Sequence, residues 1–198
     1  MDYKSLLESL GIQTRLGRCH LKLAYEYVEE QKSHLYEEEF FSLAAFSETP
    51  MLKWIKTMHS KSALSEENMI IVEILTEMYK KLDKLERILT HQDQNLLPLS
   101  HEARLGFVGH DALCLDERQS FGEIVGQGMI YARVFVPLFP ERIVGIFAKV
   151  LHPQIAKIDH IHIKNRTYFD TFVADCERSM ILDTKSLDTT QTKGSHNV

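Results

Sequence analysis

The chain has 198 residues, of which 44% are hydrophobic and 26% are charged, and 23 Lys and Arg against 28 Asp and Glu give a formal net charge of −5. This composition is that of a folded globular protein and excludes a disordered or collagen-like chain. The mild negative charge gives no electrostatic footprint for a nucleic acid polymer. No apolar run approaches the ~20 residues that cross a bilayer, so we expect no membrane span.

The cellular compartment is indicated by the first residues and by the cysteines. The chain begins without the basic flank and continuous apolar segment that are typical of a secretory signal. Its three cysteines, Cys19, Cys114 and Cys176, have no CxxC spacing. This pattern favours reduced thiols packed in a core. We therefore expect a cytoplasmic protein.

Proline and glycine divide the chain in the middle. Residues 1–91 contain one proline, Pro50, and two glycines, whereas residues 97–183 contain the other four prolines and most of the glycines. Because these residues concentrate where turns are frequent, the first half is predicted to be helical and the second mostly strand. We expect an α+β protein with a helical region over residues 1–96, a β domain over 97–183 and a disordered polar tail over 184–198.

The first residues predict an amphipathic helix that Gly11 ends in a left-handed conformation. The following segment, residues 21–46, is predicted to form one helix or two. Its acidic cluster, Glu37 to Glu39, points around such a helix and is expected to be solvated. Thr49 and Pro50 are typical of the start of a short third helix.

The strongest pattern of the first half predicts a long helix over residues 65–91. Its seam positions are separated by alternating steps of four and three, as in a heptad repeat. Asn68 falls at an a position, where a buried amide fixes register and oligomeric state. The helix either packs on the chain's own helices or associates with further copies, and both arrangements need the same stripe. The seam consists of Leu64, Asn68, Ile71, Leu75, Met78, Leu82, Leu85 and Leu89.

The second half predicts short strands over residues 104–109, 112–116, 129–136, 142–151 and 155–163. The connections are too short for helical crossovers, so we expect a largely antiparallel sheet that forms a small barrel. In the last strand, Ile161 and Ile163 are expected to point inward. A final helix, capped by Asn165 or Thr167, is predicted to bury Phe169, Phe172, Val173, Cys176 and Met180.

Motifs that carry chemistry are scarce. There is no GxSxG, HExxH, GxxxxGK[ST] or GxGxxG motif. His160 and His162 project to one side of a strand and could share a zinc ion. A strand with one face in the core and the other in solvent would show the same alternation of residues. Cys114 lies in an apolar run, which favours a packed thiol over a nucleophile. We expect no catalytic residue, no resident metal and no cofactor, and hence a protein that is not an enzyme.

Arginines at predicted strand ends are candidates for an anion site, because the guanidinium fork suits phosphate oxygens. Several would have to converge, and routine solvated or ion-paired side chains are the alternative at each position. The five arginines are Arg104, Arg118, Arg133, Arg142 and Arg166.

The second half resembles a PilZ domain over residues 97–183. The resemblance is carried by RLGFVGHDALCL, then MIYARVFVPLFP, RIVGIFAKV and AKIDHIHI, and by NRTYFDTFVADCERSMI with its Glu177-Arg178 pair. It implies a small antiparallel barrel closed by a C-terminal helix. The preceding heptad helix is similar to that of the atypical branch of the family, in which added helices assemble several barrels into an oligomer.

Typical PilZ domains bind cyclic di-GMP through an RxxxR motif and a [DN]xSxxG motif. Here no two arginines have the first spacing, and Ser100 is followed by Gly106, six residues later rather than three. The resemblance therefore implies a non-enzymatic adaptor that self-associates, binds a protein partner and acts in bacterial motility or surface-organelle control, at a flagellum or type IV pilus.

Two alternatives to this adaptor remain. One is a cyclic di-GMP receptor with a non-standard site built from Arg104, Arg133 and Arg142. The other is a metal-dependent enzyme that uses His160 and His162.

Overall fold

The computed structural model describes residues 2–44, 57, 66–90, 96–122, 128–138 and 141–192. The chain forms two compact units, one made of residues 1–44 and 99–198 and the other of residues 45–98. In the described part of the chain, no helix is long and apolar enough to cross a membrane.

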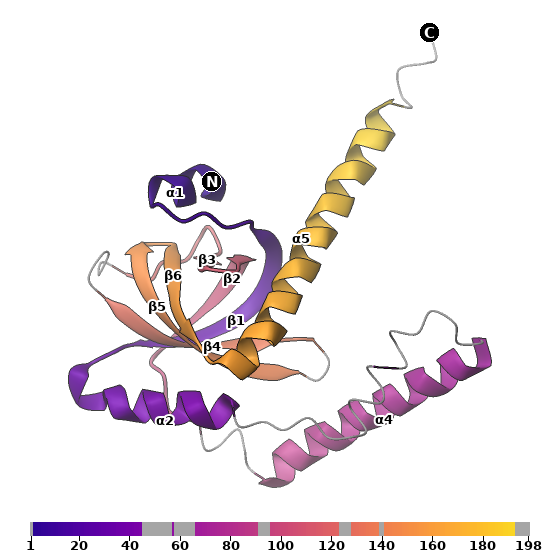
Figure 1. Cartoon of the computed structure of the whole chain (residues 1–198), viewed down its shortest axis with the longest axis horizontal. Coiled ribbons are helices and arrows are strands. Elements are labelled where there is room, and N and C mark those ends of the chain that lie inside the picture. The colour runs from indigo at the N-terminus through magenta and orange to yellow at the C-terminus, as the bar shows by residue number, and fades with distance from the viewer. Residues whose placement is uncertain are drawn as a thin grey trace. The chain divides into compact units, whose positions relative to one another are not determined.

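The first unit is built around a closed barrel of antiparallel strands in the order β1-β2-β3-β6-β5-β4. The predictions of an α+β protein and of an antiparallel barrel are confirmed (Figure 1). The strands are β1 (Gly17–Tyr27), β2 (His101–Gly109), β3 (Ala112–Leu115), β4 (Met129–Val136), β5 (Arg142–His152) and β6 (Ile155–Ile161).

The prediction that residues 1–96 form a helical region is wrong at β1. Gly17–Tyr27 is the first barrel strand and pairs with both β2 and β4. Its first seven residues alternate strictly between buried and exposed, the period of a strand with one face in a core. The barrel therefore starts well before residue 97, and the two halves of the sequence do not correspond to two domains.

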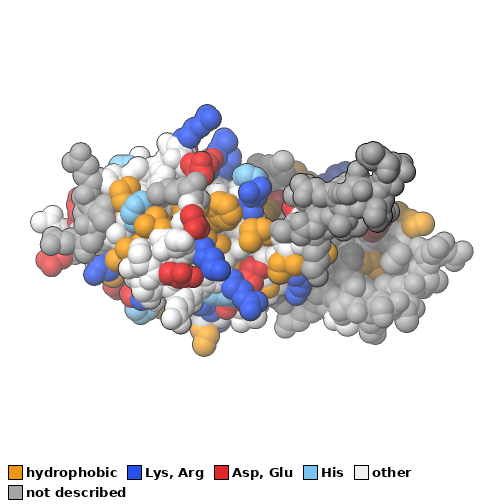
Figure 2. Space-filling model, turned by 90° about the horizontal axis from the view of Figure 1, so that it is seen from above, with side chains coloured by type: hydrophobic (Ala, Val, Ile, Leu, Met, Phe, Trp, Pro, Cys, Tyr) orange, Lys and Arg blue, Asp and Glu red, His pale blue; other side chains and the backbone are white. Residues whose placement is uncertain are grey.

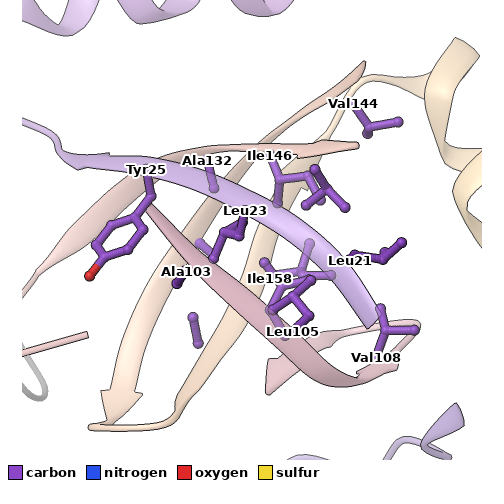
Figure 3. Packing of buried hydrophobic residues seen from close by; sticks show 14 of the residues in the cluster. Leu21, Leu23, Tyr25, Ala103, Leu105, Val108, Ala132, Val144, Ile146 and Ile158 are labelled. Carbon is purple, nitrogen blue, oxygen red and sulfur yellow. The ribbon is translucent and has the colours of Figure 1, made fainter. Parts of the chain in front are cut away.

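Alternate side chains of the strands fill the barrel interior. Leu21, Leu23 and Tyr25 of β1 point inward with residues of β2, β4, β5 and β6, as Figure 3 shows. Burial of this apolar surface, at roughly 25 cal/mol per Å², is the main term that stabilises the barrel. Phe169 and Val173 of the C-terminal helix are fully buried in the same cluster.

The C-terminal helix α5 (Ile163–Thr192) packs on the barrel, as predicted. Gly17 allows this approach, because a Cβ at that position would lie 2.4 Å from the Cβ of Cys176. Cys176 packs against the core, whereas Met180 is exposed. The inward placement of Ile163 is wrong, since this residue is 81% exposed.

Both ends of α5 differ from the sequence-based expectation. The helix starts ahead of the two expected caps, and the carbonyl oxygen of His162 accepts hydrogen bonds from the backbone N–H groups of Asn165 and Arg166. At its other end it continues to Thr192 and extends beyond the barrel (Figure 1). The expected disordered tail is therefore helical over residues 184–192, and residues 193–198 lie outside the described part.

Two helices cover the outside of the barrel on opposite sides (Figure 1). Tyr3 and Leu7 of α1 (Tyr3–Ser9) pack in a second apolar cluster that includes residues of β3 and β6. Gly11 follows α1 with a φ of 72°, which confirms its predicted left-handed conformation. Of the predicted helical segment 21–46, the structure describes residues 21–44, and among these only a 3₁₀ turn, η1 (Glu30–Lys32), and α2 (Ser33–Ala44) are helical.

The second unit contains α4 (Glu66–Thr90), a helix of 25 residues. The predicted helix over residues 65–91 is thus present between these bounds. Whether its seam packs on the chain's own helices or on further copies is not determined by these bounds. The predicted third helix at Thr49 and Pro50, and the seam residue Leu64, lie outside the described residues.

Candidate functional site

The contact between α2 and the barrel contains a buried charged group that the sequence did not reveal. Glu39, expected to be solvated, is only 6% exposed. One of its carboxylate oxygens accepts a hydrogen bond of 2.8 Å from the hydroxyl of Tyr131, and the other lies 3.5 Å from the guanidinium of Arg133. Burial, together with the nearby carboxylate, raises the pKa of Tyr131. Glu39 therefore attaches α2 to β4.

Aromatic rings complete this contact. Tyr36 stacks on Tyr131 with ring centroids 5.4 Å apart, and Phe40 packs on Phe147 at 5.3 Å. Gly145 leaves room for the rings, because a Cβ there would lie 3.0 Å from the Tyr131 hydroxyl oxygen. The outer face of β4 and β5 is thus covered by α2 around Tyr131, Gly145 and Phe147, and this part of it is not an open binding surface.

The three arginines proposed as a ligand site have different surroundings. Arg133 is buried against Glu39. The guanidinium carbon of Arg142 lies 4.7 Å from the ring centroid of Tyr168 on α5. Arg104 is exposed on β2, opposite Lys22 of β1. Because an anion site needs guanidinium forks that converge, these partners favour no common site for the three residues.

The two further arginines at predicted strand ends also lie apart from this set. Arg166 is ion-paired with Asp111 in the turn between β2 and β3 and with Asp170 on α5. His110 of the same turn lies 2.8 Å from Asp170, so these groups link the turn to α5. Arg118 is exposed.

The two histidines proposed as metal ligands have different surroundings. The ring of His160 is exposed and lies 2.6 Å from a carboxylate oxygen of Asp159. The ring of His162 contacts Phe40 and Phe41 of α2, with centroids 5.9 Å apart in each case. Among the described residues, no group of three or more His, Cys, Asp or Glu side chains is placed to hold a metal ion.

The thiols are placed in the barrel and its two apolar clusters. Burial raises the pKa of Cys19 to about 12, that of Cys114 to about 12 and that of Cys176 to about 11. A nucleophilic cysteine needs a thiolate and therefore a lowered pKa. The surroundings of Cys114 favour the packed thiol over the nucleophile.

The largest group of exposed apolar side chains lies on α4. Each member is more than half exposed, from 52% at Ile71 to 58% at Leu82. The spacing of these residues by three and four places most of them along one side of the helix. This apolar stripe consists of Ile70, Ile71, Ile74, Met78, Leu82 and Leu85.

The described part of the face in Figure 2 carries basic, acidic and hydrophobic side chains that are interspersed. No family model, no curated protein and no solved structure matches the chain. A functional proposal therefore rests on three features of the structure: the barrel with its C-terminal helix, the apolar stripe of α4 and the charges on the barrel surface.

Proposed function

We propose that this protein is a non-catalytic, PilZ-like adaptor whose copies associate through α4 and whose barrel binds another protein. The observation that carries the proposal is the exposed apolar stripe of α4. Contiguous apolar surface of this kind marks interaction sites in soluble proteins.

Burial of the stripe would supply enough free energy for association. Full burial of one large apolar side chain contributes roughly 1.5–3 kcal/mol. The stripe offers six such side chains on each copy. Because each is a little over half exposed, burial of all six on both of two copies supplies roughly 9–18 kcal/mol. This is the size of the ~4–15 kcal/mol that association costs in translational and rotational freedom.

The stripe overlaps the heptad seam but is wider. Ile71, Met78, Leu82 and Leu85 belong to both, whereas Ile74 lies beside the seam and is also exposed. A two-stranded coiled coil needs only the a and d positions, so the additional width favours a bundle of more than two helices. Leu75 of the seam is half-buried, and the side chains of Asn68 and Leu89 lie outside the described residues.

The barrel supports the second part of the proposal. A small antiparallel barrel closed by a C-terminal helix agrees with the PilZ-like architecture, and a role in bacterial motility or surface-organelle control follows from that likeness. The different surroundings of Arg104, Arg133 and Arg142 favour a protein-binding adaptor over a cyclic di-GMP receptor. The different surroundings of His160 and His162 likewise favour it over a metal-dependent enzyme.

Light scattering on the purified full-length chain tests self-association. Deletion of residues 1–96 is unsuitable, because it removes β1 from the barrel. We expect a mass that is a multiple of 22.9 kDa for the wild type and the single-chain mass for the double variant Ile74→Lys/Leu82→Lys. The control Ile163→Lys/Leu182→Lys places the same two charges at exposed apolar positions outside α4 and should keep the wild-type mass. A double variant Ile74→Lys/Leu82→Lys that keeps the wild-type mass would contradict the role of α4.

A further inference from the structure

Two cations face each other on the outside of the barrel. In the antiparallel pairing of β1 with β2, Lys22 lies directly opposite Arg104, and both side chains are exposed. Directly opposite residues have Cβ atoms ~5 Å apart, and like charges at that distance destabilise the sheet. The pair therefore weakens the barrel rather than stabilising it.

Further basic side chains lie on the same outer face of β1. Arg18, His20 and Lys22 are exposed, and they alternate with the buried residues Cys19 and Leu21. The guanidinium carbon of Arg18 lies 5.7 Å from the ring centroid of Phe107 on β2. We call this set the basic face; it consists of Arg18, His20, Lys22 and Arg104.

The charges of the basic face are not neutralised within the described part of the chain. Arg18, Lys22 and Arg104 make no ion pair there. Two carboxylates lie near. Glu102 precedes Arg104 by two residues on β2, and Asp116 donates its backbone N–H to the carbonyl oxygen of Arg104. The remaining local charge is positive, although the whole chain carries −5.

We propose that the basic face is the docking surface for an acidic segment of a partner protein. The inference rests on the proposed adaptor function and names the chemistry that the barrel recognises. Arg18 and Lys22 are four residues apart on one strand, so they span ~13 Å at 3.3 Å per residue. An extended segment with carboxylates at alternate positions matches that row.

Other anions fit the face less well. A phosphate group is best held by guanidinium forks that converge on it, whereas these cations lie in a row along two strands. A nucleic acid polymer is repelled at long range by the net charge of −5. An acidic peptide presents single charges at intervals that match the row. A short acidic segment also carries fewer charges than a nucleic acid polymer, so the net charge of −5 repels it less.

Fluorescence anisotropy with a labelled decaglutamate peptide and the full-length chain tests the proposal. We expect saturable binding that weakens as salt rises toward ~0.15 M, where the Debye length falls to ~8 Å. Lys22→Glu should weaken binding at least about tenfold, because it replaces a contact with a repulsion. It should leave the urea midpoint equal or higher, since it removes the like-charge pair.

A matched control exists elsewhere on the barrel. Lys157 of β6 lies opposite Lys149 of β5, and both are exposed. Lys157→Glu therefore makes the same change in net charge and relieves the same kind of repulsion, but it lies outside the basic face. We expect its affinity for the peptide to match that of the wild type.

Three results would overturn the proposal. The first is no saturable binding of the peptide, and the second is equal loss of affinity in Lys22→Glu and Lys157→Glu. The third is a different occupant of the basic face. Tighter, Lys22-dependent binding of oligothymidylate or cyclic di-GMP would identify a nucleotide, and a fall in the oligomeric mass of Lys22→Glu would identify a second copy. A single-chain mass for the wild type would contradict self-association through α4 and leave the peptide result to be judged by itself.

Discussion

The barrel and α4 differ in how far their apolar side chains are buried. In the barrel, Leu105, Ile130 and Val134 are fully buried by the chain itself. On α4, Ile71 and Leu82 are more than half exposed. The barrel thus has the core of an independently stable unit, whereas the apolar stripe of α4 is stabilised only when something covers it. The comparison places the apolar core in the barrel and the proposed surface for assembly on α4.

The largest effect on stability is expected at the closure of the barrel. Phe169→Ala should lower the free energy of unfolding by about 3–5 kcal/mol, because it leaves a cavity where α5 meets the core. Urea denaturation followed by circular dichroism measures the change. Ile163→Ala, on the same helix but exposed, should change it by less than about 0.5 kcal/mol. Equal effects of the two substitutions would show that α5 does not close the core.

The next largest effect is expected at the contact between α2 and the barrel. Glu39→Leu leaves the buried Arg133 without the carboxylate beside it and should cost about 3 kcal/mol. Tyr131→Phe removes only one hydrogen bond to the same carboxylate and should cost about 1 kcal/mol. Hydrogen exchange should also become faster in α2 in the first variant. Unchanged exchange in Glu39→Leu would mean that the carboxylate does not hold α2.

A smaller effect is expected from the buried thiols at high pH. Burial raises the pKa of both Cys19 and Cys114 from 9.0 to about 12. Above pH 9 the unfolded chain releases these protons while the folded chain keeps them, so stability falls as pH rises toward about 12. Each thiol contributes up to ~1.4 kcal/mol per pH unit to that slope.

The comparison of the wild type with Cys114→Ala isolates this contribution. The variant should lose less stability than the wild type between pH about 9 and about 11, whatever its stability at neutral pH. Urea denaturation at several pH values gives the two slopes. Equal slopes of the unfolding free energy against pH in the two proteins would show that folding does not raise the pKa of Cys114.

The smallest effect on unfolding is expected on α4. Leu82→Lys should change the free energy of unfolding of the barrel by less than about 0.5 kcal/mol, because the side chain is 58% exposed. An effect as large as that of Phe169→Ala would contradict the comparison. It would mean that the stripe is covered by the chain's own residues, which is the alternative that the heptad pattern leaves open.

The strands of the second half could be predicted because their pattern is local. β4 and β5 alternate apolar side chains and are bounded by turn residues, and β4 has the predicted bounds 129–136. β1 has the same alternation at Cys19, Leu21 and Leu23. The scarcity of proline and glycine predicts a helix there and fails, because this scarcity does not distinguish a helix from a long strand.

The burial of the outer face of β4 could not be predicted. Tyr131 and Arg133 alternate with the core residues as solvent-facing side chains do, yet α2 covers both. The partner of Arg133 is Glu39, 94 residues away in the chain. No local pattern shows which carboxylate of an acidic cluster is placed over a buried guanidinium. For the same reason, the different surroundings of the three candidate arginines emerge only from the tertiary structure.

The basic face lies between these two cases. The exposed positions of β1 follow from its alternation once that segment is known to be a strand. The opposition of Lys22 and Arg104 depends on the register between two strands that are distant in sequence. The sequence contained the residues of the surface but not the pairing that brings their charges together.

Sedimentation equilibrium of the full-length wild type tests the central claim, that the apolar stripe of α4 joins copies of the chain. Over about a hundredfold range of protein concentration, association makes the apparent mass increase with concentration, by mass action. The account predicts a mass that reaches a multiple of 22.9 kDa. A mass of 22.9 kDa at every concentration would contradict it.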